Sequence, residues 1–480
     1  MVAALERDAA EPIEAEASAQ PSAFLRHRSD LYRFGSAAVA IGAVQSPIAL
    51  YLPNYYGAYV GMPIGQIALA FLIVRLFDIS FDPLTGVLLD RTRTRFGQAR
   101  PWLIVGTILV TLASPWLFLA PKGAGMLHLI LGLLVIYAGV SMANLAQAAW
   151  SARLITDYTE RSRLWGWIQV SGSIGIFLLF AAPLVFAGSG DARHGDIKTG
   201  DDVRMMGSIL TVAVPIIVAF ALFRIPEPPV PVSAKHDERV RFADYVQLLR
   251  IPNVRRIVIT DAVLTFASGI TAVLFFFFWS YARGYKAKET TMVILAYMVA
   301  VFIGTPFWVR IARKTGKKAA LIASLLCYPV IIPAVALFPR NHMDLVVPGQ
   351  FLLGLSYGSA LFLLRSMAAD TADEIRLKLG KDCTGQLFAL FGSTAKLGTA
   401  ISAGCTLLLL QVAGFDAKLG TANTPGAIFA VEVLYVAGPG LFAVAGALLL
   451  AGYKLNRSEH ERILLELSTR APASGTGSTA

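Results

Sequence analysis

Long apolar runs dominate this chain and restrict what it can fold into. Segments of roughly 20 apolar residues follow one another, and 56% of the 480 residues are hydrophobic while only 15% are charged. Soluble domains carry about 25% charged residues. A helix of about 20 apolar residues crosses the ~30 Å core of a bilayer, so the sequence predicts an all-α polytopic membrane protein. The twelve expected spans are 34–52, 63–88, 101–121, 126–150, 164–187, 205–224, 255–281, 290–309, 318–338, 346–365, 384–412 and 425–453.

The basic residues predict how these spans are oriented. If the N-terminus is cytoplasmic, the cytoplasmic segments hold 31 of the 42 Lys and Arg residues and the opposite loops hold 9. Only Arg75 and Lys396 remain inside spans. This bias follows the positive-inside rule and predicts a multi-pass protein of the cell (inner) membrane with both termini cytoplasmic. It also accounts for the net charge of +11 without a nucleic-acid partner, because the charges are spread over short loops.

Two polar ends and one internal linker divide the chain. Residues 1–33 are expected to form a disordered cytoplasmic tail, since they lack the basic and apolar regions of a signal peptide. A Pro-rich linker with a short amphipathic helix, lying on the membrane surface or packed on the bundle, is expected at 225–254. It separates a six-helix bundle at 34–224 from a second one at 255–453. Residues 454–480 are expected to form another cytoplasmic tail.

The two halves repeat one arrangement of sequence. After the second span comes "DPLTGVLLDRTRTRFGQARPWLIV", and after the eighth comes "GTPFWVRIARKTGKKAALIA". Both contain a proline within the helix, then a basic turn with glycine, then a return to apolar sequence. Parallel six-helix repeats about an axis along the membrane normal are typical of major facilitator transporters. The predicted fold is therefore a major facilitator fold, with twelve transmembrane helices in two pseudo-symmetric six-helix bundles.

The segment "RLFDISFDPLTG" at 75–86 places three charges inside the second span. Arg75, Asp78 and Asp82 are spaced three and four residues apart, which puts them on one helix face. An ionised side chain at the bilayer centre costs at least ~2.5–3.5 kcal/mol, so these residues should face the bundle interior or a water-filled cavity. Two close carboxylates repel each other unless a proton or cation joins them. The pair is a candidate site for H⁺ or Na⁺; a purely structural Arg–Asp pair is the alternative, and it accounts for only one aspartate.

Lys396 is the second charged residue deep in a span, in "FALFGSTAKLGTAISAG". We expect its ammonium to donate to a polar substrate or to neutralise the carboxylates; the alternative is a lysine that reaches the membrane interface. Asp261 and Glu432 lie nearer the ends of their spans, and we expect both to be interfacial.

Polar residues also share one face of the fourth span. Ser141, Asn144 and Gln147 recur at i, i+3 and i+6. They could supply neutral oxygen ligands to a cation or hydrogen bonds to a sugar. Hydrogen bonding between helices is an equally good explanation of the same pattern.

Three stretches together resemble one transporter family. "VRLFDISFDPLTGVLLDRTRTRFGQARPWLIVG", "DYTERSR" and "ADTADEI…GQLFALFGSTAKLG" are similar to landmarks of the glycoside–pentoside–hexuronide:cation symporters, the melibiose permease family of major facilitators. The resemblance covers essentially the whole chain. It implies cation-coupled symport of a sugar, glycoside or sugar acid by alternating access. It further implies a cation site, with possible Na⁺, at positions matching Asp78, Asp82, Ser141 and Asn144, and a coupling role for Lys396.

Several positions depart from the family's pattern. Its span-four acid is Asn144 here, its sugar-binding acid in the first span falls near Ala40, its sugar-contacting aromatic falls at Ala148 and its arginine falls at Gln169. One carboxylate fewer in the cation site shifts the expected coupling ion from Na⁺ toward H⁺, and melibiose is not the expected substrate. The candidates for substrate binding or coupling are Arg75, Asn144, Gln147, Gln169 and Lys396.

Other functions have less support in the sequence. An uncoupled facilitator or an exporter of a small polar solute fits the same fold, and a non-transporting membrane sensor is a further alternative. HExxH and Walker A motifs do not occur, and the six histidines are scattered, so we expect neither an enzyme nor an ATP-driven pump. No cofactor is expected beyond the coupling ion, and no obligate protein partner. The expected partners are the lipid bilayer and a small polar solute, with a carbohydrate favoured.

Overall fold

The computed structural model describes a helical chain over residues 28–154, 158–186, 200–222, 225, 227, 242–340, 342–358, 360–380 and 383–470. Of the expected tails at 1–33 and 454–480, residues 1–27 and 471–480 lie outside these residues, as does most of the Pro-rich linker, whereas 28–33 and 457–470 are helical. The first series of helices is α2 (Arg28–Leu50), α3 (Leu52–Tyr55), the π-helix η1 (Tyr56–Val60), α4 (Ile64–Arg91), α5 (Ala99–Phe118), α6 (Met126–Leu154), α7 (Tyr158–Phe186) and α8 (Asp201–Leu222).

The second series follows the linker. Its first member, α9, occupies the segment where the sequence predicts a short amphipathic helix. The series is α9 (Phe242–Arg250), α10 (Pro252–Phe276), the π-helix η3 (Phe277–Ala282), α11 (Ala287–Thr315), α12 (Lys317–Ala336), α13 (Met343–Tyr357), α14 (Ala360–Leu379), α15 (Thr384–Val412), the 3₁₀ helix η4 (Gly420–Ala422), α16 (Pro425–Ala451) and α17 (Arg457–Arg470).

The apolar runs form the membrane spans that the sequence predicts. Among the described residues, eleven helices are long and apolar enough to cross a membrane, and the pair Tyr32–Leu50 and Leu52–Val60, bent by 46°, makes twelve if it is one span. The prediction of an all-α multi-pass protein is therefore confirmed. Several spans are longer than expected, the first and the tenth most of all. The first continues past its bend, and the tenth runs over Met343–Leu379 because α14 extends its polar end beyond the apolar run.

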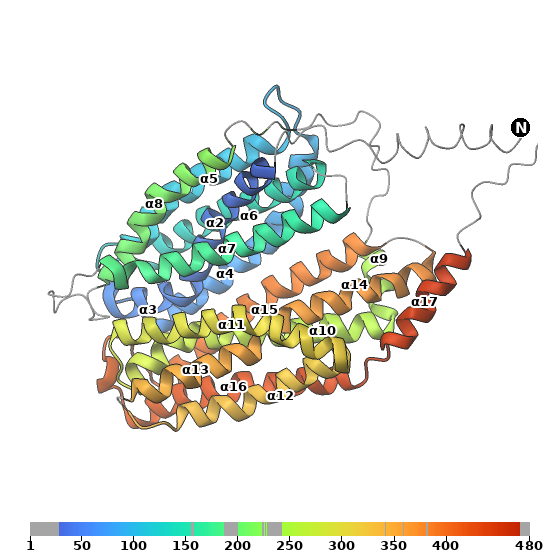
Figure 1. Ribbon diagram of the computed structural model, residues 1–480. Coiled ribbons are helices and arrows are strands. Elements are labelled where there is room, and N and C mark those ends of the chain that lie inside the picture. The colour runs from blue at the N-terminus through green and yellow to red at the C-terminus, as the bar shows by residue number, and fades with distance from the viewer. Residues whose placement is uncertain are drawn as a thin grey trace, which may run out of the picture.

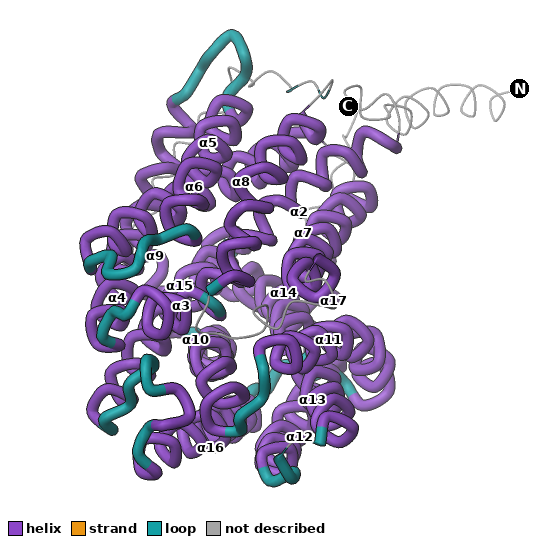
Figure 2. Tube along the Cα trace, turned by 90° about the vertical axis from the view of Figure 1, so that its left-hand side faces the viewer, coloured by secondary structure: helices purple, strands orange, loops and turns teal. Residues whose placement is uncertain are grey.

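The helices form two groups that face each other (Figure 1). One contains α2 and α4 to α8, and the other contains α10 to α16. In both views α5 and α8 lie on the far side of one group, and α12 and α16 lie on the far side of the other (Figure 2). Across the boundary α4 packs against α15, and α7 packs against α11. The interior between the groups is therefore lined by helices from both halves of the chain.

The two halves meet through matching bends. In each half the first helix ends in a π-helical turn, η1 or η3, and a glycine with positive φ follows: Gly61 at 87° and Gly284 at 81°. Tyr281 Oη of η3 donates to Asn54 Oδ1 of α3 at 2.7 Å. The rings of Tyr51 and Phe276 lie 4.4 Å apart. We call these four side chains, Tyr51, Asn54, Phe276 and Tyr281, the aromatic seal.

Small residues allow the closest helix contacts within each half. A Cβ added to Gly106 of α5 would lie 2.6 Å from the backbone oxygen of Gly139 of α6. In the second half a Cβ added to Gly354 of α13 would lie 2.4 Å from the backbone oxygen of Tyr297 of α11. Transmembrane helices gain most of their association energy from such close backbone approach, so these glycines fix how each bundle packs.

Candidate functional site

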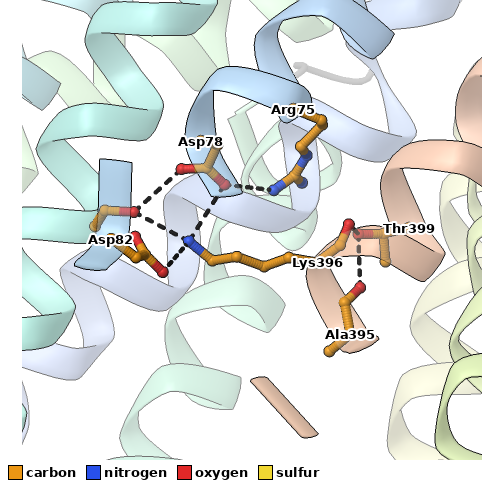
Figure 3. A network of polar contacts seen from close by, with 7 residues as sticks. Arg75, Asp78, Asp82, Ala395, Lys396 and Thr399 are labelled. Atoms are coloured by element: carbon orange, nitrogen blue, oxygen red, sulfur yellow. Dashed lines mark hydrogen bonds and ion pairs between the residues drawn. The ribbon is translucent and has the colours of Figure 1, made fainter. Parts of the chain in front are cut away.

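Five polar side chains from three helices meet between the two halves. α4 presents Arg75, Asp78 and Asp82 on one face, as their spacing predicts, and α15 and α6 add Lys396 and Ser141 (Figure 3). Lys396 Nζ lies 3.3 Å from Asp78 Oδ2 and contacts Asp82 Oδ2. It also lies 3.3 Å from Ser141 Oγ. We call these five residues the charge cluster.

The two aspartates of the charge cluster have unequal surroundings. Asp78 is 5% exposed; it accepts from Ser141 Oγ at 3.2 Å and lies 3.3 Å from Arg75 Nη1 as well as from Lys396. Asp82 is more exposed, and within the described chain its buried Oδ1 has no hydrogen-bond partner. Asp78 is therefore the fully satisfied carboxylate, and Asp82 keeps one free acceptor.

With all four charged groups ionised, the charge cluster has no net charge. Arg75 and Lys396 balance Asp78 and Asp82, and the Arg75 guanidinium also lies 4.1 Å over the ring of Tyr137. A charged group in a low-dielectric interior persists only when it is paired. The sequence predicts Arg75 beside the two carboxylates on α4 and offers Lys396 as a group that could neutralise them. The fold brings Lys396 to both carboxylates from α15, a contact between distant helices that spacing along one helix does not show.

A cavity of about 510 Å³ lies between the halves next to the charge cluster. This size falls within the range of small-molecule sites, about 300–1,000 Å³. Arg75 and Lys396 line it, so the two cations of the cluster form part of its wall. The second half of the chain contributes hydroxyl groups to the same wall, from Ser268, Thr271, Tyr297, Tyr328, Tyr357 and Thr399.

A group of tyrosines near Gln350 is a feature that the sequence analysis missed. The ring of Tyr357 lies 6.4 Å from that of Tyr297 and 6.1 Å from that of Tyr328. Gln350 is 1% exposed, and its Oε1, on the cavity wall, has no hydrogen-bond partner among the described residues. Gln350 and Tyr357 are seven residues apart on α13 and so share a face. Tyr297 and Tyr328 lie on α11 and α12, so no spacing rule could group all four.

Three other predicted residues lie away from this cavity. Asn144 is exposed on α6 one turn beyond Ser141 and does not line the cavity. Gln147 is buried, and its Nε2 donates to the backbone oxygen of Phe34 at 3.4 Å, so it joins α6 to α2. Gln169 is exposed on α7 and is likewise not part of the cavity wall. Their roles in cation or substrate binding stay predictions.

Asp261 is not interfacial, and this prediction was wrong. It is 1% exposed on α10, accepts a hydrogen bond of 2.6 Å from Thr394 Oγ1 of α15, and lies 3.5 Å from Arg365 Nη2 of α14. The Arg365 guanidinium in turn lies 4.5 Å over the ring of Phe391. Its position along the span suggested an interface, but the helix face that carries Asp261 is packed against α14 and α15.

Comparisons with known proteins agree with this architecture. A family profile described as "MFS/sugar transport protein" matches residues 33–457. The chain is 22% identical to the "Putative glycoside/cation symporter YagG" of Escherichia coli (strain K12), with 93% of this chain and 96% of that one covered. It is 24% identical to the "Isoprimeverose transporter" of Lactiplantibacillus pentosus, with 93% of each chain covered.

Solved structures show the same arrangement of helices. One titled "Inward open conformation of the xylose transporter XylE from E. coli" superposes with a TM-score of 0.62 at 13% identity, and covers 91% of this chain and 99% of that one. Another, titled "Crystal structure of nucleoside transporter NupG", has a TM-score of 0.60 at 12% identity, with 90% and 100% covered. The chain thus has the major facilitator fold, and it belongs to the MFS/sugar transport protein family.

Proposed function

We propose that this protein is a secondary active symporter that moves a carbohydrate together with a cation by alternating access. The observation that carries the proposal is the double use of Arg75 and Lys396, which line the cavity and also pair with the carboxylates of α4. A solute that binds Arg75 or Lys396 weakens the ion pairs that this residue makes with the aspartates. Occupancy of the cavity and of the carboxylates is therefore linked, and such linkage is reciprocal.

The names of relatives support this class of function. Full-length relatives are named as a glycoside/cation symporter and as an isoprimeverose transporter. The cavity is suited to a sugar ring, because hydroxyl groups and aromatic rings together match the polar edge and the apolar faces of a carbohydrate. Transport of a small carbohydrate is what these names have in common with the cavity described above.

We favour H⁺ over Na⁺ as the coupling ion. Lys396 Nζ already lies between Asp78 and Asp82, where a metal ion would otherwise bridge them. Hard cations require many oxygen ligands, six to eight in the case of Ca²⁺, whereas the side chains of the charge cluster supply two carboxylates and one hydroxyl. Asp82 Oδ1, which has no hydrogen-bond partner among the described residues, is the acceptor that we assign to the proton.

The conformation fits a cavity that faces the cytoplasm. The aromatic seal closes the boundary between the halves at the end of the first span. The distribution of Lys and Arg assigns that end to the outside. On this orientation the N- and C-termini are cytoplasmic, and opening of the aromatic seal is the step that admits substrate.

Transport by purified protein in liposomes tests the proposal. Uptake of radiolabelled D-xylose, D-glucose and D-glucuronate would be measured with an imposed pH gradient, a Na⁺ gradient or neither. We expect the pH gradient to drive accumulation of at least one of them, and Asp78→Asn and Asp82→Asn each to abolish accumulation. Asp344→Asn, an exposed carboxylate in the first turn of α13, is the control. Full accumulation in both cluster variants, or equilibration without accumulation in the wild type, would contradict coupling.

A further inference from the structure

We propose that a second cavity, at the ends of α10, α14 and α16, binds a phosphate-bearing anion. This basic cavity has a volume of about 680 Å³ and shares no lining residue with the cavity between the halves. Four cations and two carboxylates line it, which leaves two positive charges in excess: Arg255, Arg256, Lys378, Lys454, Glu374 and Glu459. An excess of this sign attracts anions and disfavours cations.

Both carboxylates of the basic cavity already have partners. Glu374 is buried; its Oε1 lies 2.6 Å from Lys378 Nζ, and its Oε2 accepts from Asn253 Nδ2 at 2.9 Å. Glu459 of α17 pairs with Arg462 of the same helix. These pairs join α10 to α14 and use up the negative charge of the wall, so neither carboxylate is available to the other cations.

The other three cations, Arg255, Arg256 and Lys454, form no ion pair with a carboxylate of the described chain. Arg256 lies against the end of α16, because a Cβ added to the C-cap Gly452 would be 2.6 Å from its Cζ. The backbone N–H of Lys454 donates to Asn253 Oδ1 at 3.2 Å. Packed backbone therefore positions the basic cavity, while the side chains of Arg255 and Lys454 are exposed and can reach a ligand.

The chemistry of these cations favours a phosphate group. A phosphate monoester carries a charge of about −1.5 to −2 at pH 7, which matches the excess charge of the wall. The guanidinium groups of Arg255 and Arg256 can each donate two parallel hydrogen bonds to phosphate oxygens, a geometry that a lysine cannot offer. Lys454 adds a point charge from the segment between α16 and α17. One phosphate would thus connect α10 to this segment.

The basic cavity lies at a level of the fold where phosphate groups are abundant. The apolar part of α10 begins directly after Arg256, and that of α16 ends at Ala451. α17 packs against α14 beyond this boundary (Figure 1). The distribution of Lys and Arg predicts that this side is cytoplasmic, and basic pockets between transmembrane helices on that side bind lipid head groups. A soluble phosphate compound offers the same chemistry.

Thermal unfolding of the purified protein in a neutral detergent tests the proposal, because a ligand that binds the folded state raises the unfolding temperature. Phosphatidylglycerol would be titrated against phosphatidylcholine with the same acyl chains, and sodium phosphate and glycerol 3-phosphate against NaCl of equal ionic strength. We expect at least one phosphate probe to raise the unfolding temperature above its control. A response to phosphatidylglycerol alone assigns the basic cavity to a lipid head group, and a response to the soluble probes assigns it to a free phosphate compound. A response to none would overturn the inference.

A matched pair of variants separates the basic cavity from the general positive charge of this side. Arg255→Gln with Lys454→Gln removes two exposed cations of the wall and should raise the half-saturating concentration of the active probe about tenfold or more. Arg313→Gln with Lys314→Gln removes two exposed cations from the last turn of α11 and should leave it within about twofold of wild type.

Equal losses of affinity in the two double variants would show attraction to the charged surface as a whole and would overturn the inference. Lys454→Gln alone should give an intermediate affinity, and it provides the comparison if the double variant does not fold. None of these substitutions touches the charge cluster, so coupled transport can fail or hold without affecting the result. The inference therefore stands or falls separately from the proposed function.

Discussion

At the scale of single residues, Ser141 is the neutral member of the charge cluster. Its Oγ donates to Asp78 and accepts from Lys396, so one hydroxyl links a carboxylate and an ammonium that come from different halves. Hydrogen bonds to charged groups contribute about 1.5–3 kcal/mol. We expect Ser141→Ala to raise the half-saturating substrate concentration in gradient-driven uptake by roughly tenfold.

A second serine of α6 controls for the loss of a hydroxyl. Ser151 is fully buried and donates to the backbone oxygen of Ala148 at 2.7 Å, away from the charge cluster. Ser151→Ala should leave the half-saturating concentration within about twofold of wild type, since it removes one neutral hydrogen bond worth about 1 kcal/mol of stability. Equal effects of the two substitutions would mean that Ser141 acts only on packing.

Asp261 allows a prediction about stability at the same scale. Removing one partner of a buried ion pair costs about 3–5 kcal/mol, whereas replacing both by apolar residues is often neutral or stabilising. Asp261→Asn should therefore lower the unfolding temperature in detergent, and Asp261→Leu with Arg365→Met should restore most of it. Asp370→Asn, which breaks a more exposed pair with Lys317, should have a much smaller effect. A double variant less stable than Asp261→Asn would contradict this account.

Residues on one helix could be predicted from the sequence, and contacts between helices could not. The spacing of Arg75, Asp78 and Asp82 gives their common face, because helix geometry alone decides it. That Lys396 joins them depends on how α15 packs against α4. For Asp261 the position in the span indicated a place near its end but not which face of the helix carries it, and the partners on α14 and α15 decide its role.

At the scale of elements, the aromatic seal lies beside two π-helical turns, η1 and η3, that occupy equivalent places in the two halves. π-helical turns are rare and often occur at functional sites. Span positions follow from apolar runs and were predicted. The bend after α2 and both π-turns were not, because a hydropathy pattern does not distinguish i→i+5 from i→i+4 backbone hydrogen bonding. Tertiary contacts, such as that of Tyr281 with Asn54, hold these turns.

Weakening the aromatic seal should shift the conformational equilibrium. Tyr281→Phe removes the hydrogen bond to Asn54, worth about 1 kcal/mol, which corresponds to roughly a fivefold change in an equilibrium. In protein whose three cysteines are replaced by serine, Gln45→Cys places a thiol on the cavity wall. We expect Tyr281→Phe to speed its labelling by an impermeant maleimide from outside. Tyr285→Phe, after η3, is the comparison, and equal rates in all forms would exclude a gating role for Tyr281.

Close helix packing gives a second prediction for the elements. A Cβ on Gly106 would lie 2.6 Å from the Gly139 backbone oxygen, whereas a Cβ on Gly166 of α7 would have no heavy atom within 4 Å. Gly106→Ala should therefore separate α5 from α6 and lower the unfolding temperature. Gly166→Ala should be neutral or slightly stabilising, since alanine favours helix by about 1 kcal/mol over glycine. Unfolding in detergent, followed by circular dichroism, compares the two.

At the scale of the whole molecule, the two halves share one site without sharing its chemistry. The first half supplies the carboxylates, and the second supplies Lys396 and the polar aromatic wall. The repeat in the sequence predicts that the two halves have similar architecture. The residues that differ between the two repeats give each half its own part of the site. Because Lys396 joins the halves through the aspartates, any ligand that displaces it also changes how strongly the halves are held together.

This division has a consequence for the charge that crosses the membrane in each cycle. The charge cluster is neutral when empty, and it carries one positive charge when one proton and a neutral sugar are bound, so the loaded half-cycle moves one charge. Uptake of the accumulated sugar into liposomes should therefore respond both to a pH gradient and to a potential set by valinomycin and K⁺. A potential of 100 mV is worth about 2.3 kcal/mol per charge, so one uncompensated charge per cycle would change the accumulation ratio roughly 50-fold. Asp344→Asn should behave like the wild type, whereas Asp82→Asn should lose the response to pH. Accumulation that does not depend on the potential would show that no net charge enters with the sugar, and would contradict symport of one proton with a neutral sugar.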